Sequence, residues 1–189
     1  VGVGTEAVRI ATDVAGVRRT VESVRDDVTV LGEALGRSDE SLAVLRKTWK
    51  GGTVVHKGRH FEAVGNTANP TPIRNDVPIW IGGNSQLTRR RVAEGCQGWM
   101  PMPNPRSLGS ARRTAHIDGV DDLRQGIAYL KDHAKKVGRN GPFDVFFPVM
   151  VGGTVGSPKF DLAAYRAHVA ELEAIGVTWV LAPIGGRNM

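Results

Sequence analysis

The second half of the chain alternates between short apolar runs and amphipathic stretches. The apolar runs predict strands at residues 77–81, 98–102, 143–151 and 177–183. Between them, apolar residues recur every three or four positions and predict helices at about 85–94, at 121–136 and at 161–175. Strands that alternate with helices in this way favour right-handed crossovers and a parallel sheet.

Two of these helices have a clear apolar face. In 121–136 the face consists of Leu123, Ile127, Leu130 and Ala134. In 161–175 it consists of Leu162, Tyr165, Val169 and Leu172. The run Val77–Ile81 lacks the apolar and polar alternation of a half-exposed strand, so we expect it to be buried on both faces.

The first half is less regular. A helix with apolar residues Leu42, Leu45 and Trp49 is expected to begin with Ser38 or Asp39 as its cap. Strands at 53–56 and 59–64 around a turn at Lys57–Gly58 predict a hairpin, and a loop is expected over 103–120. We therefore expect one domain with three parts: a helical segment (1–52), a hairpin and connection (53–76) and a four-stranded parallel part (77–189).

Composition excludes several classes of protein. With 41% hydrophobic and 23% charged residues among 189, the chain is not intrinsically disordered. No apolar run approaches the ~20 residues of a membrane span, and the net charge of +6 is scattered, so we expect neither membrane nor nucleic-acid binding. The five histidines and Cys96 lack metal-ligand spacing, so no metal site is expected. The sequence shows no signal peptide, which predicts a cytoplasmic protein, and it begins with Val1, which leaves a fragment of a longer protein open.

The turn Gly82–Gly83–Asn84–Ser85 is the main candidate for chemistry, because it joins an expected strand to an expected helix. The amides of Ser85, Gln86 and Leu87 would be unpaired donors at the helix N-terminus, and the hydroxyls of Ser85 and Thr88 add to them. Such donors bind phosphate or another anion. The same residues also suit a plain turn in which Ser85 only caps the helix.

The segments Pro78-Ile-Trp-Ile-Gly-Gly-Asn-Ser85 and Gly98-Trp-Met-Pro101 resemble the luciferase-like monooxygenase family. Weaker likeness extends to both sides. It includes Gly2-Val-Gly4 with Glu6, Leu42–Trp49, Val54 with Gly58 and Phe61, and Val177-Thr-Trp-Val180.

The resemblance implies a TIM-like (β/α)8 barrel, which needs about 250 residues. This chain would supply the end of the fourth strand and strands five to eight, with the hairpin as a small insertion. Strand order alone also leaves an open doubly wound sheet possible. Many relatives have Asp-Gly-Trp where this chain has Gln97-Gly98-Trp99.

The resemblance also implies a cofactor, coenzyme F420 (favoured) or FMN. Its phosphate would lie at Gly82, Gly83, Asn84 and Ser85, with Gly4 and Thr5 approaching it from the loop after the fourth strand. Trp99 and Met100, near the end of a strand, are the best candidates for a substrate pocket. No catalytic acid or base is assigned.

Two functions follow as hypotheses. In the first, the protein is a luciferase-like oxidoreductase that uses a reduced flavin or deazaflavin to oxygenate, reduce or oxidise a small organic substrate. In the second, the chain is a catalytically incomplete half barrel, or a non-catalytic partner subunit, that keeps only the phosphate loop. Half a barrel has open sheet edges, so we expect a homo-oligomer or pairing through those edges.

Overall fold

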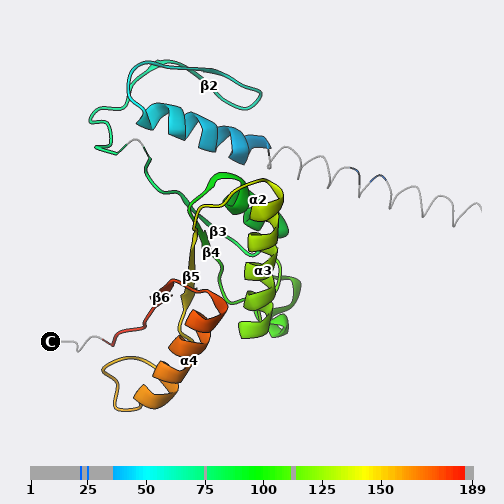
Figure 1. Ribbon diagram of the computed structural model, residues 1–189, viewed down its shortest axis with the longest axis vertical. Helices are drawn as coiled ribbons and strands as arrows, with labels where there is room; N and C mark the ends of the chain where they lie inside the picture. Colours follow the sequence, from blue (N-terminus) through cyan, green and yellow to red (C-terminus); the bar gives the residue numbers. More distant parts are fainter. Residues whose placement is uncertain (1–21, 23–24, 26–35, 75, 112–113, 186–189) are drawn as a thin grey trace, which may run out of the picture. The chain divides into compact units, whose positions relative to one another are not determined.

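The computed structural model describes residues 22, 25, 36–74, 76–111 and 114–185 (Figure 1). The chain divides into two compact units, Val1–Val77 and Pro78–Met189. The expected helical segment 1–52 lies largely outside the described residues. Within the described part, no helix combines the length and the apolar character that crossing a membrane requires.

The first unit contains a helix over residues 36–49 and a hairpin. The hairpin pairs β1 (Val54–Lys57) with β2 (Glu62–Asn66) in antiparallel register. Residues 36–38 are already helical, so Ser38 and Asp39 lie inside this helix rather than capping it. The second strand begins three residues later than the sequence pattern predicts.

Glu40 accounts for the later start of β2, because its carboxylate binds the hairpin to the helix over residues 36–49. It accepts hydrogen bonds from His56 Nε2 (2.8 Å) and from the backbone N–H groups of His60 and Phe61 (both 2.9 Å). With these groups used, residues 58–61 form the turn, closed by Gly58 N–H donating to the Phe61 carbonyl. Partial burial raises the pKa of the Glu40 carboxyl, but the hydrogen bonds from His56, His60 and Phe61 outweigh it and lower the pKa to about 2.

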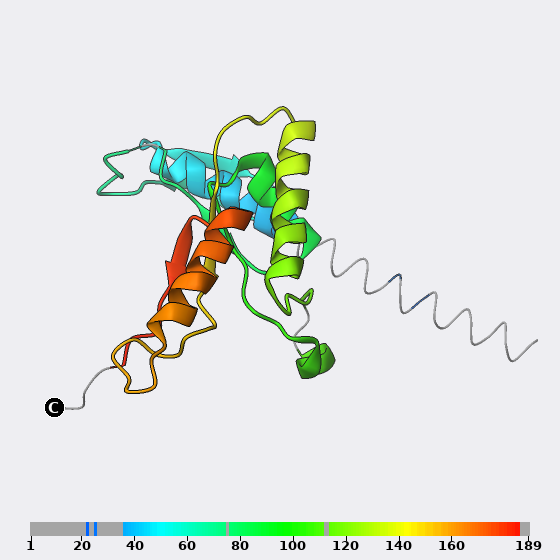
Figure 2. The ribbon, with the colours of Figure 1, turned by 60° about the horizontal axis from the view of Figure 1, so that its bottom comes forward.

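The second unit is a four-stranded parallel sheet in the order β3-β4-β5-β6. Its strands are β3 (Trp80–Gly82), β4 (Gly98–Met100), β5 (Asp144–Pro148) and β6 (Trp179–Leu181). The helices that connect them are α2 (Gln86–Gly95), α3 (Val120–Lys136) and α4 (Leu162–Ile175), with the short 3₁₀ helix η1 (Arg106–Ala111) after β4. Each strand is followed in space by the next in sequence, so right-handed crossovers place all three helices on one face of the sheet (Figures 1 and 2).

The parallel sheet and its helices confirm the expected α/β class, with shorter strands than the sequence pattern predicts. The first strand begins at Trp80 rather than Val77, since Pro78 has no N–H and the Ile79 N–H is taken by the Gln97 side chain (2.9 Å). The expected loop 103–120 is not wholly irregular. It contains η1 and a β-bridge between Asn104 and Ile117.

The core lies between the sheet and α3. The predicted apolar face of α3 is confirmed, with Leu123, Ile127, Leu130 and Ala134 all buried. Trp99 of β4 is 0% exposed. A Cβ atom at Gly126 of α3 would lie 2.5 Å from the Trp99 ring. Helix and indole thus approach each other because Gly126 has no side chain.

The other face of the sheet carries a pair of indoles. Trp80 of β3 and Trp179 of β6 meet edge to face, with ring centroids 5.7 Å apart. Trp80 lies over Gly98 of β4, where a Cβ atom would come within 2.5 Å of the indole. The two outer strands therefore make a side-chain contact across the two inner strands.

Candidate functional site

Hydrogen bonds to β4 fix the position of the turn after β3. Gly83 has φ +113°, a conformation that glycine adopts readily, and a Cβ atom there would lie 3.2 Å from Thr88 Oγ1. The indole Nε1 of Trp99 donates to the Gly83 carbonyl (2.8 Å), and the Gly83 N–H donates to the Met100 carbonyl (3.3 Å). The turn is therefore a rigid part of the sheet edge.

Asn84 joins this turn to the loop after β4. Its side chain is 1% exposed. Nδ2 donates to the carbonyls of Met102 (2.8 Å) and Ala115 (3.0 Å), and Oδ1 accepts from the Met102 N–H (3.0 Å). Its own backbone N–H donates to Thr114 Oγ1 (3.2 Å). Because all these donors are used within the chain, the geometry gives Asn84 a positioning role instead of direct contact with a phosphate.

Ser85 begins α2 and leaves the following amides unpaired. Its Oγ accepts from the Thr88 N–H (3.1 Å) and lies 2.9 Å from Thr88 Oγ1. Within the described part of the chain, no hydrogen bond engages the N–H groups of Ser85, Gln86 or Leu87. One hydroxyl hydrogen is used between Ser85 and Thr88, so the other remains for an external acceptor. The helix end thus offers three amides and one hydroxyl to an anion, as the sequence predicts.

Arg89 of α2 contacts the backbone of the turn. Its Nη1 donates to the Asn84 carbonyl (2.8 Å), and its guanidinium lies 5.6 Å from the Trp99 ring centroid and 5.3 Å from that of Tyr129. Burial lowers the pKa of the Arg89 guanidinium, with Tyr129 acting in the opposite direction. An arginine remains cationic even so, so Arg89 adds positive charge to the site while its Nη1 is committed to the backbone.

The remaining predicted site residues are placed less favourably or lie outside the description. Trp99 belongs to the core between sheet and helix, so a pocket role for it stays a prediction without geometric support. Met100 is half-buried in β4 and pairs with Gly82, where a Cβ atom would lie 3.8 Å from the Met100 carbonyl oxygen. Gly4 and Thr5 lie outside the described residues.

Several residues of the site carried no clear sequence signal. Thr114 and Ala115, some 30 positions after the turn, hold Asn84 in place. The Oε1 atom of Gln97 accepts the Ile79 N–H, so Gln97 forms a structural hydrogen bond at the start of β3. The loop containing Thr114 has no periodic pattern, and only the fold brings it to the turn.

Fold and turn together define an α/β protein in which a turn at the carboxyl edge of a parallel sheet presents unpaired N–H donors. A model of the luciferase-like monooxygenase family matches residues 2–151, and the chain belongs to this family. No curated protein matches the chain by sequence.

Solved structures show the same fold. The coenzyme F420-dependent tetrahydromethanopterin reductase from Methanopyrus kandleri superposes with a TM-score of 0.55 at 13% identity, covering 77% of this chain and 56% of that one. An F420-dependent secondary alcohol dehydrogenase, solved in complex with an F420–acetone adduct, gives a TM-score of 0.52 at 12% identity, covering 75% and 53%. The chain therefore spans little more than half the length of either structure.

Proposed function

We propose that this chain is the phosphate-binding part of a luciferase-like oxidoreductase that acts on a small organic substrate with coenzyme F420 or, less favoured, FMN. The observation that carries the proposal is the set of unpaired donors at the start of α2, the N–H groups of Ser85, Gln86 and Leu87. Family membership and the F420 dependence of the two structures of similar fold support the choice of cofactor.

The residues of the turn would bind and orient the cofactor. The phosphate would accept from the three amides and from the Ser85–Thr88 hydroxyl pair, with the positive end of the α2 dipole adding to the attraction. Gly82 would let the cofactor approach the backbone, and Asn84 and Arg89 would keep the turn rigid. When bound, a reduced deazaflavin supplies a hydride and a reduced flavin supplies electrons to dioxygen.

We also propose that the four strands are consecutive strands of a (β/α)8 barrel. The sheet order follows the sequence with no reversal, and all crossovers lie on one face, as in barrels and unlike doubly wound sheets. The outer strand β6 supports this, because Trp179, Val180 and Leu181 are 55%, 40% and 52% exposed. Pairing of two chains through these edges follows as an expectation, and a solution mass of 20.3 kDa would argue against it.

The test is a fluorescence titration of the chain with coenzyme F420 and, separately, with FMN. Wild-type protein should bind at least one of them saturably. Ser85→Asp keeps an N-cap of the same quality but places a negative charge beside the phosphate. We expect binding to weaken on the order of 100-fold, since two unit charges about 4 Å apart near a protein surface repel by up to about 4 kcal/mol.

Ser85→Asn is the matched control, because asparagine caps a helix as well as aspartate does but carries no charge. Its cofactor affinity should stay within a few-fold of wild type. Equal loss in both variants would show that the cap, not the phosphate, was disturbed. Full binding by Ser85→Asp would place the cofactor elsewhere and overturn the proposal.

A further inference from the structure

The first 49 residues carry a sequence pattern that the proposed function does not use. Apolar residues recur there at alternating steps of three and four, at Ala7, Ile10, Val14, Val17, Val21, Val24, Val28, Leu31 and Leu35. The same steps lead on to Leu42, Leu45 and Trp49, with Ser38 as the one polar member. A repeat of this kind, sustained over six heptads, is the a and d pattern of a coiled coil. These positions are called the heptad stripe below.

The described residues agree with this heptad register. Glu22 and Arg25, at a b and an e position, are both helical and exposed. In the described helix that follows, Glu40 and Lys47 both occupy f positions, on the face opposite the stripe. These two side chains contact His56 of β1, whose Nε2 lies 2.8 Å from Glu40 Oε1 and whose Nδ1 lies 3.4 Å from Lys47 Nζ. The hairpin therefore covers the back of this helix, and the heptad stripe faces away from the hairpin.

The first unit does not bury its own share of the stripe. Leu45 is 38% exposed, and Leu42 and Trp49 are half-buried. Among the described residues of this unit, Val54 is the only fully buried hydrophobic residue. A contiguous row of exposed apolar side chains marks a surface for association.

The length of the stripe decides what kind of partner it needs. A helix over residues 7–49 would be about 64 Å long at about 1.5 Å per residue. Helix α3, the longest helix described in the second unit, has 17 residues and spans about 26 Å. A surface of that size covers less than half of the stripe. The stripe therefore needs a partner that is itself long and helical.

The charges beside the stripe favour a parallel pair of identical helices. In such a pair, a g position lies beside the e position five residues later in the partner, so Asp13 pairs with Arg18. No g–e pair along the stripe joins like charges. An antiparallel pair of residues 7–35 would instead place Arg18 beside Arg25, and it would bring two acidic g positions together.

We propose that the heptad stripe binds a second copy of this chain as a parallel coiled coil. The stripe suits its own copy because both its apolar positions and its flanking charges are self-complementary. This interface uses neither the open edges of the sheet nor the amide donors at the start of α2. Its test is therefore independent of the proposed cofactor site.

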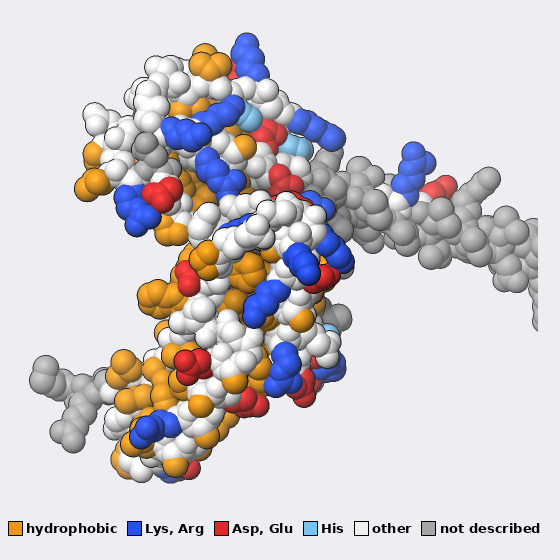
Figure 3. Space-filling view, in the orientation of Figure 1, with side chains coloured by type: hydrophobic (Ala, Val, Ile, Leu, Met, Phe, Trp, Pro, Cys, Tyr) orange, Lys and Arg blue, Asp and Glu red, His pale blue; other side chains and the backbone are white. Residues whose placement is uncertain are grey.

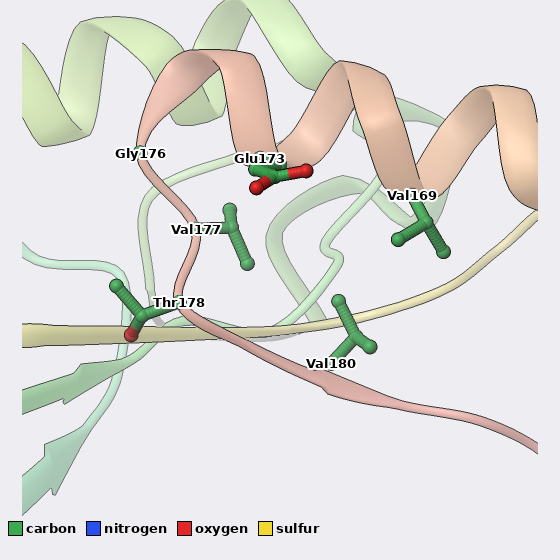
Figure 4. A pocket seen from close by; sticks show the side chains of 6 residues that line it. All are labelled: Val169, Glu173, Gly176, Val177, Thr178 and Val180. Atoms are coloured by element: carbon green, nitrogen blue, oxygen red, sulfur yellow. The ribbon is translucent and has the colours of Figure 1, made fainter.

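The outer edge of the sheet is the other surface through which two chains can pair. Beside β6 lies a groove of about 500 Å³, lined by Val169 and Glu173 of α4 together with Val177 and Val180 (Figure 4). Val180 is 40% exposed, so Val180→Asp is tolerated by the fold while it places a charge in this groove. This variant should leave association through the heptad stripe unchanged, and it separates the two surfaces.

The experiment is sedimentation equilibrium of the full chain, whose single-chain mass is 20.3 kDa. Wild type should have the mass of at least two chains. The double variant Val17→Asp/Val24→Asp places charges at two d positions and should weaken association at least about 100-fold, because an apolar interface disfavours unpaired charges. Thr12→Asp/Ser23→Asp is the matched control, since it adds the same charge at an f and a c position and should keep the wild-type mass.

A cysteine pair tests the orientation of the helices. Cys96 is buried, so a cysteine introduced into the heptad segment provides the accessible thiol. Val14→Cys lies at an a position and should form a disulfide-linked dimer under mild oxidation, on the order of 10-fold or more faster than Thr12→Cys at an f position. An antiparallel pair would place residue 14 beside residue 28, and neither variant would then cross-link preferentially.

Three outcomes would overturn the proposal. The first is a wild-type chain that is monomeric at micromolar concentration. The second is a Val17→Asp/Val24→Asp variant with the same mass as its control, which would leave only the sheet edges to hold the chains together. The third is equal cross-linking of Val14→Cys and Thr12→Cys, which does not depend on the double variant folding. Titration with F420 or FMN is a separate readout, and its failure would bear on the cofactor site alone.

Discussion

The helices α3 and α4 lie on the same face of the same sheet, and they are covered to very different degrees. Leu123 and Leu130 of α3 are both 0% exposed. On α4 only Leu172 is buried, and Leu162 is 57% exposed. Figure 3 shows the same contrast at the surface, where hydrophobic side chains gather around α4 and β6.

This difference follows from position in the sheet. Helix α3 packs between α2 and α4, whereas α4 is followed by the outer strand β6. Helix α3 is therefore more deeply buried than α4, because it is the more amphipathic of the two and has a helix on each side. The exposed side supports the proposal that β6 pairs with a further strand of a barrel.

The largest expected effect comes from comparing two tryptophans, Trp99 of the inner strand β4 and Trp179 of the outer strand β6. Trp99→Ala should lower the free energy of unfolding by about 3–5 kcal/mol, because it leaves a cavity under α3. It also removes the donor to the Gly83 carbonyl. Trp179→Ala should cost about 1 kcal/mol, chiefly the contact with Trp80. Urea denaturation measures both, and equal losses of unfolding free energy would contradict the contrast between the buried inner strand and the exposed outer strand.

A smaller effect is expected from two polar residues at the carboxyl edge of the sheet, Asn84 after β3 and Thr154 after β5. Asn84→Ala removes three buried hydrogen bonds of about 1 kcal/mol each and should lower the free energy of unfolding by about 2–3 kcal/mol. Thr154→Ala should change it by less than about 0.5 kcal/mol, since the hydroxyl has no partner to lose. The same denaturation experiment applies. If Asn84→Ala left the free energy of unfolding unchanged, the hydrogen bonds of Asn84 would not hold the turn as the structure shows.

The smallest expected effect is a loss of stability at low pH. Arg106 donates to the Asp122 carboxylate (2.9 Å) at the start of α3, and the Asp118 N–H donates to it as well. These contacts, the Arg106 hydrogen bond first, hold the pKa of Asp122 below its ordinary value of 3.8. A lowered folded pKa contributes stability that is present above about pH 4 and is lost as the pH falls through the folded pKa.

The free energy of unfolding of the wild-type chain should therefore decrease as the pH falls from about 4 through the folded pKa of Asp122. Denaturation at each pH measures this decrease. Asp122→Asn should remove this share of the pH dependence, and Arg106→Gln should reduce it in the same way. If both variants kept the full acid dependence of wild type, the Arg106–Asp122 pair would not be its source.

The fold class and the donors of the turn could be predicted from the sequence because they depend on local patterns. Periodicity identified α3 and its buried face, and the Ser85 position identified the start of α2. Strand ends could not be predicted, since they depend on distant partners such as Gln97 at Ile79 and Glu40 at the hairpin. The positioning role of Asn84 depends on Thr114 and Ala115, which only the folded chain brings near.

The edge-to-face contact between Trp80 and Trp179 also gives the sheet an optical signature. Indoles this close couple their electronic transitions, and such coupling produces paired bands of opposite sign in the circular dichroism spectrum. The two rings belong to the outermost strands β3 and β6. The spectrum of the unlabelled protein therefore reports on whether these two outer strands keep their relative position, and on whether an added subunit or ligand separates the two rings.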